Sequence, residues 1–154
     1  MYRKVFIFIM VGALSSGCET VNVVRPLAPP EGVPGEVLVY RESSILAMAE
    51  AMPFGVNGET YAILQTSQYA RFHLANGPYT FFVQGATGDR YIAKIDVGFD
   101  LLCIRAFPNP TNVLKSLSPT GFLIGQTFLL ESAPCPPLSV LSKLQEVAVE
   151  YRAK

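Results

Sequence analysis

Cys18, the first of the chain's three cysteines, stands where its thiol could receive a covalent group. The basic residues Arg3 and Lys4 open the chain, an apolar run covers residues 5–14, and small residues at 15–17 lead to Cys18. This order of basic, apolar and small segments is typical of a cleaved secretory signal peptide. The apolar run has about ten residues whereas a membrane span needs about 20, so we expect cleavage rather than a permanent transmembrane helix.

The residues directly before Cys18 also resemble the lipobox of bacterial lipoproteins, although Ser15 stands where that pattern usually has leucine. The resemblance implies a lipoprotein signal peptide over residues 1–17, and diacylglycerol and N-acyl groups on Cys18. Several acyl chains anchor a protein stably, whereas one chain binds only marginally. Because Glu19, not the aspartate of inner-membrane retention, follows, the resemblance implies an outer-membrane lipoprotein on the periplasmic side. The alternative is a secreted protein in which Cys18 forms a disulfide.

The other two thiols, Cys103 and Cys135, are predicted to pair with each other. They are the only cysteines left once Cys18 is acylated, and the compartment outside the inner membrane oxidises thiols. The alternative is two separate buried thiols.

Few other side chains could do chemistry. The single histidine, His73, lies beside Arg71 on the polar face of a predicted strand, which indicates a surface residue rather than part of a catalytic triad. Asp89, Asp96 and Asp100 lack the spacing of a cation-binding loop and indicate turns. No phosphate-binding loop or dinucleotide fingerprint is present. We therefore expect no enzyme, no metal, no cofactor beyond the lipid and no small-molecule ligand.

The charge balance argues against nucleic acid as a partner. Cleavage after residue 17 leaves 10 basic and 12 acidic residues, a net charge of −2. Nucleic-acid binding needs a basic stripe, and the lysines and arginines of this chain are scattered singly.

The elements that would carry these residues begin after a proline-rich segment. Residues 18–35 contain Pro26, Pro29, Pro30 and Pro34, so we expect an extended, partly stiff tether that could reach roughly 50 Å from the membrane. The alternative is that this segment docks along a partner as an extended strand.

From residue 36 onward, short runs rich in β-branched and aromatic residues alternate with Gly, Asn, Asp and Pro, a spacing typical of all-β domains. The predicted strands cover residues 36–41, 54–56, 60–65, 69–75, 79–84, 90–97, 101–107 and 122–131. The pattern predicts a mainly β chain in which residues 36–154 form one small antiparallel β-sandwich, immunoglobulin-like or transthyretin-like.

Three turns are predicted to join strands as hairpins. Asn57-Gly58 is the strongest signal, because a type I′ turn needs positive φ at both central residues. Residues 76–78 (Asn-Gly-Pro) and 85–89 are predicted to form two further hairpins. Within strand 90–97, Tyr91 and Ile95 share one face and Lys94 and Asp96 the other, which indicates a half-buried strand.

Two segments suggest helices. Apolar residues recur at helical spacing near the end, so we expect an amphipathic helix over about residues 139–152 that covers the outer face of the late strands or docks a partner. Residues 42–52 have helix-forming composition between two strands, and we expect a short helix or loop that crosses between the sheets.

Residues 36–105 resemble a family of bacterial lipoproteins similar to PEGA-type modules. The resemblance rests on the "YR" opening at 40–41, the Val56-Asn57-Gly58 turn, the aromatic strand at 69–74 and the Gly77-Pro78 return. It implies a transthyretin-like or immunoglobulin-like sandwich and no catalytic residues.

Anchor, tether and compact domain together predict a non-enzymatic, membrane-anchored lipoprotein that serves as a structural or accessory component of an envelope assembly, such as a secretion, pilus or motility machine. Its partners would be the membrane, through the lipid anchor, and other envelope proteins. The alternative is a glycan- or peptidoglycan-binding module, which exposed rings at Tyr61, Tyr69 or Tyr91 would favour.

Overall fold

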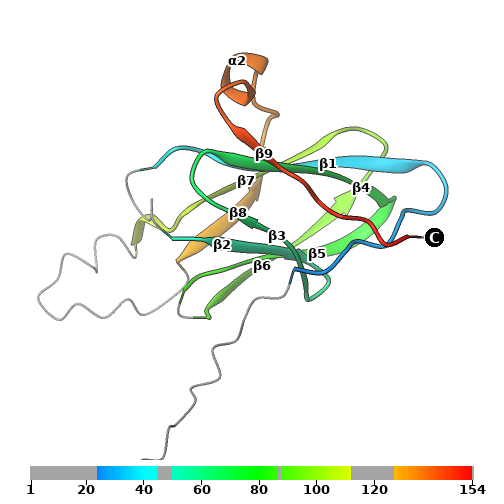
Figure 1. Cartoon of the computed structure of the whole chain (residues 1–154), viewed down its shortest axis with the longest axis horizontal. Helices are drawn as coiled ribbons and strands as arrows, with labels where there is room; N and C mark the ends of the chain where they lie inside the picture. Colours follow the sequence, from blue (N-terminus) through cyan, green and yellow to red (C-terminus); the bar gives the residue numbers. More distant parts are fainter. Residues whose placement is uncertain (1–23, 45–49, 87, 112–126, 154) are drawn as a thin grey trace, which may run out of the picture.

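Two β-sheets face each other across a shared apolar layer (Figure 1). The computed structural model describes residues 24–44, 50–86, 88–111 and 127–153. Within them, one sheet has the strand order β8-β7-β1-β4-β9 and the other the order β3-β2-β5-β6. The strands are β1 (Pro34–Arg41), β2 (Met52–Val56), β3 (Glu59–Leu64), β4 (Gln68–Ala75), β5 (Gly77–Gln84), β6 (Arg90–Val97), β7 (Leu102–Pro108), β8 (Phe128–Ser132) and β9 (Gln145–Val147). The predicted mainly β sandwich is therefore confirmed.

The strand order separates the two kinds of sandwich that the sequence left open. In an immunoglobulin-type sandwich the first strand pairs with the second. Here β1 lies between β4, with which it is antiparallel, and β7, with which it is parallel. The order departs from the immunoglobulin arrangement and leaves the transthyretin-like alternative.

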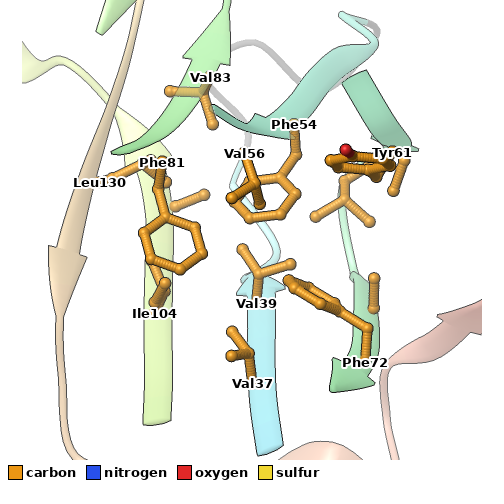
Figure 2. Packing of buried hydrophobic residues seen from close by; sticks show 14 of the residues in the cluster. Val37, Val39, Phe54, Val56, Tyr61, Phe72, Phe81, Val83, Ile104 and Leu130 are labelled. Carbon is orange, nitrogen blue, oxygen red and sulfur yellow. The ribbon is translucent and has the colours of Figure 1, made fainter. Parts of the chain in front are cut away.

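The core fills the space between the sheets with side chains from alternate strand positions. Phe54 of β2 lies 5.9 Å from Phe72 of β4 and 6.1 Å from Phe81 of β5, measured between ring centroids. Figure 2 shows Val37 and Val39 of β1 pointing toward these rings. Strand β6 alternates as predicted, because its odd-numbered side chains are buried or half-buried and its even-numbered ones are exposed.

Two of the three predicted turns are confirmed. Asn57 and Gly58 have φ of 50° and 87° and join β2 to β3, which pair antiparallel. Residues 85–89, apart from residue 87, join the antiparallel strands β5 and β6. The predicted hairpin at residues 76–78 is wrong, because β4 and β5 belong to different sheets. Gly77, at φ 146°, stands where the chain passes from one sheet to the other.

The predicted helix over residues 139–152 is also wrong. Only Leu138–Leu141 forms a helix, α2, and the chain then enters β9, which pairs parallel with β4. Leu141 and Leu144 nevertheless pack on Leu38 and Cys103 and so cover the outer face of β1 and β7. The cover lies where it was expected, but its secondary structure is different.

Two further predictions fall partly outside the described residues. A short helix or loop was expected over residues 42–52, and residues 45–49 of this segment lie outside the described residues. The segment follows β1 of one sheet and leads to β2 of the other. Residues 122–126 of the last predicted strand are likewise outside, and the strand is described from Phe128.

Candidate functional site

The proline-rich segment before β1 lies against the sandwich from Arg25 onward, and we call residues 25–31 the strap. The Arg25 N–H donates to the Thr60 carbonyl at 2.8 Å, and the Leu27 N–H donates to the Glu150 carbonyl at 2.7 Å. Leu27 in turn accepts from the Arg152 N–H at 2.8 Å. The strap is therefore held between β3 and the C-terminal residues. This part of the expected tether is therefore bound to the domain, and Leu27 forms an isolated parallel β-bridge with Tyr151.

Leu27 anchors the strap. Its side chain is 4% exposed and belongs to the main core cluster, although its neighbours Pro26 and Ala28 are exposed. Burying a leucine side chain contributes about 1.5–3 kcal/mol. A single large aliphatic residue within a proline-rich segment was the sequence signal for this docking, and the prediction of a tether did not use it.

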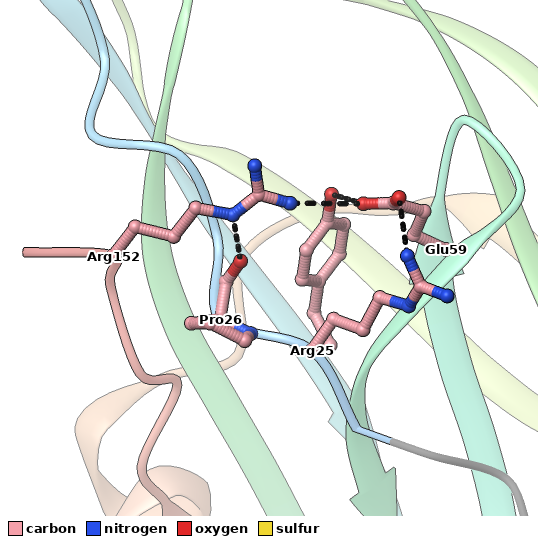
Figure 3. Close-up of polar contacts among 5 residues, drawn as sticks. Arg25, Pro26, Glu59 and Arg152 are labelled. Atoms are coloured by element: carbon pink, nitrogen blue, oxygen red, sulfur yellow. Dashed lines mark hydrogen bonds and ion pairs between the residues drawn. The ribbon is translucent and has the colours of Figure 1, made fainter.

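A polar cluster around Glu59 fastens the strap to the C-terminal segment (Figure 3). The Glu59 carboxylate lies 3.3 Å from Arg25 Nη1 and 3.7 Å from Arg152 Nη2, and it accepts a 2.9 Å hydrogen bond from the Tyr61 hydroxyl. Arg152 Nε donates to the Pro26 carbonyl at 3.2 Å. The charged side chains are 37–59% exposed, so each ion pair contributes less than about 1 kcal/mol and mainly fixes the register of the strap.

Tyr61 stands at the boundary between this cluster and the core. Its ring is 9% exposed and packs within the core cluster, while its hydroxyl reaches Glu59. Burial, and secondarily the hydrogen bond and charge of Glu59, raise the pKa of the Tyr61 phenol. The phenol therefore stays protonated and keeps donating to Glu59 at neutral pH.

A pocket of about 380 Å³ opens between the strap and the end of the sandwich. Strap residues 27–31 form one wall. The other wall comes from the ends of the strands and the β2–β3 turn, and consists of Val56, Asn57, Tyr61, Leu74, Ala75 and Tyr79. The volume lies within the usual range of small-molecule sites, about 300–1,000 Å³.

The polar groups of the pocket are few. The Asn57 side-chain Oδ1 accepts from the Thr80 N–H at 3.1 Å, and the Asn57 N–H donates to the Thr80 carbonyl at 2.7 Å, so this turn is held rigidly. Within the described residues no hydrogen bond uses Asn57 Nδ2, which leaves two donors. Glu31, an exposed residue of the strap, also lines the pocket.

The opposite end of the sandwich contains a buried cation that the sequence did not reveal. Arg41, at the end of β1, is 0% exposed, and its Nη1 donates to the carbonyls of Glu50 at 2.6 Å and Leu64 at 3.1 Å. Its Cζ lies 4.7 Å from the centroid of the Phe128 ring. Burial lowers the pKa of the guanidinium. An arginine directly after an apolar strand is common in sequences, so nothing in the sequence indicates that the Arg41 side chain is buried.

The residues singled out in the sequence do not gather at one place. Cys18 lies outside the described residues. Cys103 and Cys135 form the predicted disulfide, with Cα atoms 5.1 Å apart, on the outer face of the five-stranded sheet. His73 is exposed on β4, and its backbone N–H donates to the Tyr151 hydroxyl at 2.7 Å.

The three tyrosines considered for glycan binding differ in their surroundings. Tyr61 lines the pocket, although most of its ring is buried. Tyr69 is half-buried and donates its hydroxyl to Glu146 at 3.0 Å, while Tyr91 is half-buried against the core. Tyr79, which the prediction did not single out, is the half-buried aromatic residue of the pocket. Tyr79 follows a proline and begins an aromatic strand, so the sequence pattern alone did not distinguish it from ordinary core residues.

The described residues contain no group of three or more His, Cys, Asp or Glu side chains that could hold a metal ion. Across the same part of the chain, no helix has the length and apolar character needed to cross a membrane. The chain matches no protein-family model, no curated protein and no solved structure.

Proposed function

We propose that the protein is a non-enzymatic lipoprotein, anchored in the outer membrane through acylated Cys18, that serves as a structural or accessory component of an envelope assembly. The assembly would be a machine of the secretion, pilus or motility kind, and the sandwich would supply its binding surface. The docking of the strap at Arg25 carries this proposal, because it joins the segment that follows Cys18 to a defined place on the domain.

The strap shortens the distance between the proposed anchor and the sandwich. Arg25 follows Cys18 by seven residues, and seven residues span at most about 25 Å when fully extended. This is half the reach of roughly 50 Å expected for a free tether. A domain held this close to the bilayer by β3 and the C-terminal segment has a restricted orientation, which suits a component that contacts partners at the membrane surface.

The anchor is tested with a matched pair of cysteine variants. We expect the wild-type protein and Cys103→Ser to fractionate with membranes and to carry acyl chains on the N-terminal peptide, as measured by mass spectrometry. Cys18→Ser should lose both the lipid and the membrane association. A Cys18→Ser protein that still carried lipid would refute the anchor.

The assembly is tested by affinity purification of the tagged mature protein from mild detergent extracts after cross-linking in intact cells. We expect a defined set of envelope proteins that is lost from the Cys18→Ser sample. Recovery of the free monomer alone from wild-type cells, with and without cross-linking, would contradict an accessory role.

A second function, binding of a glycan such as peptidoglycan, is supported by the pocket at the end of the sandwich. The pocket combines the tyrosines 61 and 79 with an amide and a carboxylate, the kinds of group that recognise sugar rings and hydroxyls. Co-sedimentation of the protein with purified sacculi tests this function. A protein that stays entirely in the supernatant would rule it out.

A further inference from the structure

The pocket under the strap is small and has an aromatic wall. At about 380 Å³ it lies near the lower end of the range for ligand sites, so its occupant would be a small group rather than a long chain. Tyr79 lines it, half-buried, and its ring lies 6.2 Å from the Phe81 ring at an interplanar angle of 48°. Since Phe81 is fully buried, the packing holds the Tyr79 ring in place as a preformed surface.

The polar groups complement hydroxyl and amide groups better than they complement an acyl chain. Asn57 supplies the two Nδ2 donors on a turn that Thr80 holds rigidly, and Glu31 supplies acceptors from the opposite wall. A purely apolar occupant would leave both residues without partners and would have to desolvate them, which costs free energy. A ligand with an apolar face and a polar rim fits this lining best.

The charge of the lining selects further among such ligands. Among the described residues, Glu31 is the one charged residue that lines the pocket, and no lysine, arginine or histidine lines it. An anionic ligand would therefore meet a like charge without a compensating cation, whereas a neutral or ammonium-bearing ligand would not.

We propose that this pocket binds one or two sugar units of a neutral or amino-bearing glycan, with Tyr79 stacking on a ring, Asn57 donating to hydroxyl or acetamido oxygens, and Glu31 accepting from hydroxyl or ammonium groups. The proposal rests on the second function given above and names its site and ligand class. Strap residues 27–31 form half of the site, so the glycan contacts the same segment that leads to the proposed anchor.

The test measures affinity by titration calorimetry or saturation-transfer NMR on the full mature protein in detergent. The probes are the disaccharides of N-acetylglucosamine and of glucosamine, with a proline-rich decapeptide and a glucuronic acid disaccharide as comparisons. We expect wild-type binding of both amino-sugar probes with a Kd of about 10 mM or tighter. The glucuronic acid disaccharide should bind at least about threefold more weakly than the N-acetylglucosamine probe, because it brings a like charge to Glu31.

Three variants assign the contacts. Tyr79→Ala should weaken binding of both probes at least about tenfold, the usual cost of removing an aromatic anchor. Tyr91→Ala, which removes another half-buried tyrosine outside the pocket lining, should leave the affinity unchanged. Glu31→Gln, at an exposed strap residue, should weaken the glucosamine probe at least about threefold relative to the N-acetylated one.

A fourth variant guards against misfolding of Tyr79→Ala. Asn57→Gly keeps a residue suited to positive φ and the backbone N–H bond to the Thr80 carbonyl, so the turn type is retained. The Nδ2 donors are lost together with the Oδ1 acceptor of the Thr80 N–H, and we expect weaker binding of both sugars.

Several results would overturn the proposal. These are no binding of either sugar at the highest concentration, equal binding by wild type and by both Tyr79→Ala and Asn57→Gly, or tighter binding of the proline-rich peptide than of the sugars. If Tyr79→Ala co-sediments with sacculi to the same extent as the wild-type protein, the assignment of the glycan to this pocket is wrong while glycan binding stands. If sacculi fail to co-sediment with wild type, the second function itself fails.

Discussion

Leu27→Ala is expected to release the strap while the sandwich stays folded. Leu27 is the one strap residue that is buried, and the remaining contacts of the strap are backbone hydrogen bonds and exposed ion pairs. Removing its side chain weakens the docking directly. The strands of the sandwich keep their own ladders and core, so they should not open.

The magnitude follows from the contacts that hold the strap. Burial of Leu27 contributes about 3 kcal/mol, three backbone hydrogen bonds about 1 kcal/mol each, and two exposed ion pairs about 1 kcal/mol together. Ordering residues 25–31 costs about 1 kcal/mol per residue, less at the prolines. The sum is close to zero. Docking is therefore marginal, and the loss of about 2 kcal/mol on truncation lowers the docking constant about thirtyfold.

Hydrogen–deuterium exchange resolves this change residue by residue. Since the docking constant is close to one, the docked fraction falls from about a half to a few per cent when that constant drops about thirtyfold. The amides of Leu27 and Arg152 bond only across the strap, so their protection should fall about twofold, to almost none. The Asn57 amide, which bonds to Thr80 in the β2–β3 turn, should keep its protection. Val33→Ala is the matched control, because Val33 lies just beyond the strap with 71% of its surface exposed and its truncation should change neither rate.

Two results would refute the reasoning. Unchanged protection of Leu27 and Arg152 would mean that the strap does not depend on the buried leucine. A parallel loss of protection at these amides and at Asn57 would mean that the strap and the sandwich unfold as one cooperative unit.

Three further predictions concern stability. Cys103→Ser, which opens a loop closed over a sequence separation of 32 by Cys103 and Cys135, should lower the free energy of unfolding by about 4 kcal/mol in urea titrations, and reductant should then have no further effect; wild type that loses nothing in reductant would contradict this. Arg41→Ala should cost about 3–5 kcal/mol because one buried and one partly buried carbonyl lose a charged donor, at about 1.5–3 kcal/mol each, whereas Arg71→Ala, which removes a 43% exposed partner of an ion pair, should cost less than about 1 kcal/mol; equal losses would show that burial of the guanidinium does not matter. The raised pKa of Tyr61 means that the folded state holds the phenol proton more tightly than the unfolded state, so its contribution is complete below about pH 10 and is lost as the pH rises through the folded pKa; alkaline unfolding curves of Tyr61→Phe should fall less steeply, and identical curves would exclude the effect.

Strands and local turns could be predicted because their causes lie within a few residues. Alternation in 90–97 reports burial of one strand face, and Asn57-Gly58 supplies two residues that tolerate positive φ. Neither inference needs a distant partner. The cysteine pair could be predicted for a different reason, since Cys103 and Cys135 are the only cysteines that follow Cys18.

The division of strands between sheets could not be predicted, because it depends on packing over the whole domain. Residues 76–78 carry ordinary hairpin residues, yet Gly77 leads β4 of one sheet into β5 of the other. Hairpin and crossover use the same turn-forming residue types. The crossover is favoured because it places β4 and β5 in opposite sheets, where Phe72 and Phe81 are buried in the same core.

The C-terminal segment contains two periodicities at once. Leu141, Leu144 and Val147 repeat at helical spacing, whereas Val147, Val149 and Tyr151 repeat every second residue. The exposed edge of β4 favours the second pattern, because β9 pairs with it and places Val147 and Val149 against the core. The helical pattern governs only the first part, where Leu141 and Leu144 cover the outer face.

The strap connects the two proposed functions by thermodynamic linkage. Residues 27–31 are a wall of the pocket, so a ligand that contacts this wall binds the docked strap better than the released one. Ligand binding then stabilises docking by RT ln(1 + [L]/Kd), and docking strengthens ligand binding reciprocally. Since the docking free energy is close to zero, a modest ligand concentration would keep the strap docked and hold the sandwich close to the proposed lipid anchor. Leu27→Ala would accordingly weaken sugar binding without touching Tyr79, because the apparent Kd is the intrinsic Kd divided by the fraction of molecules whose strap is docked.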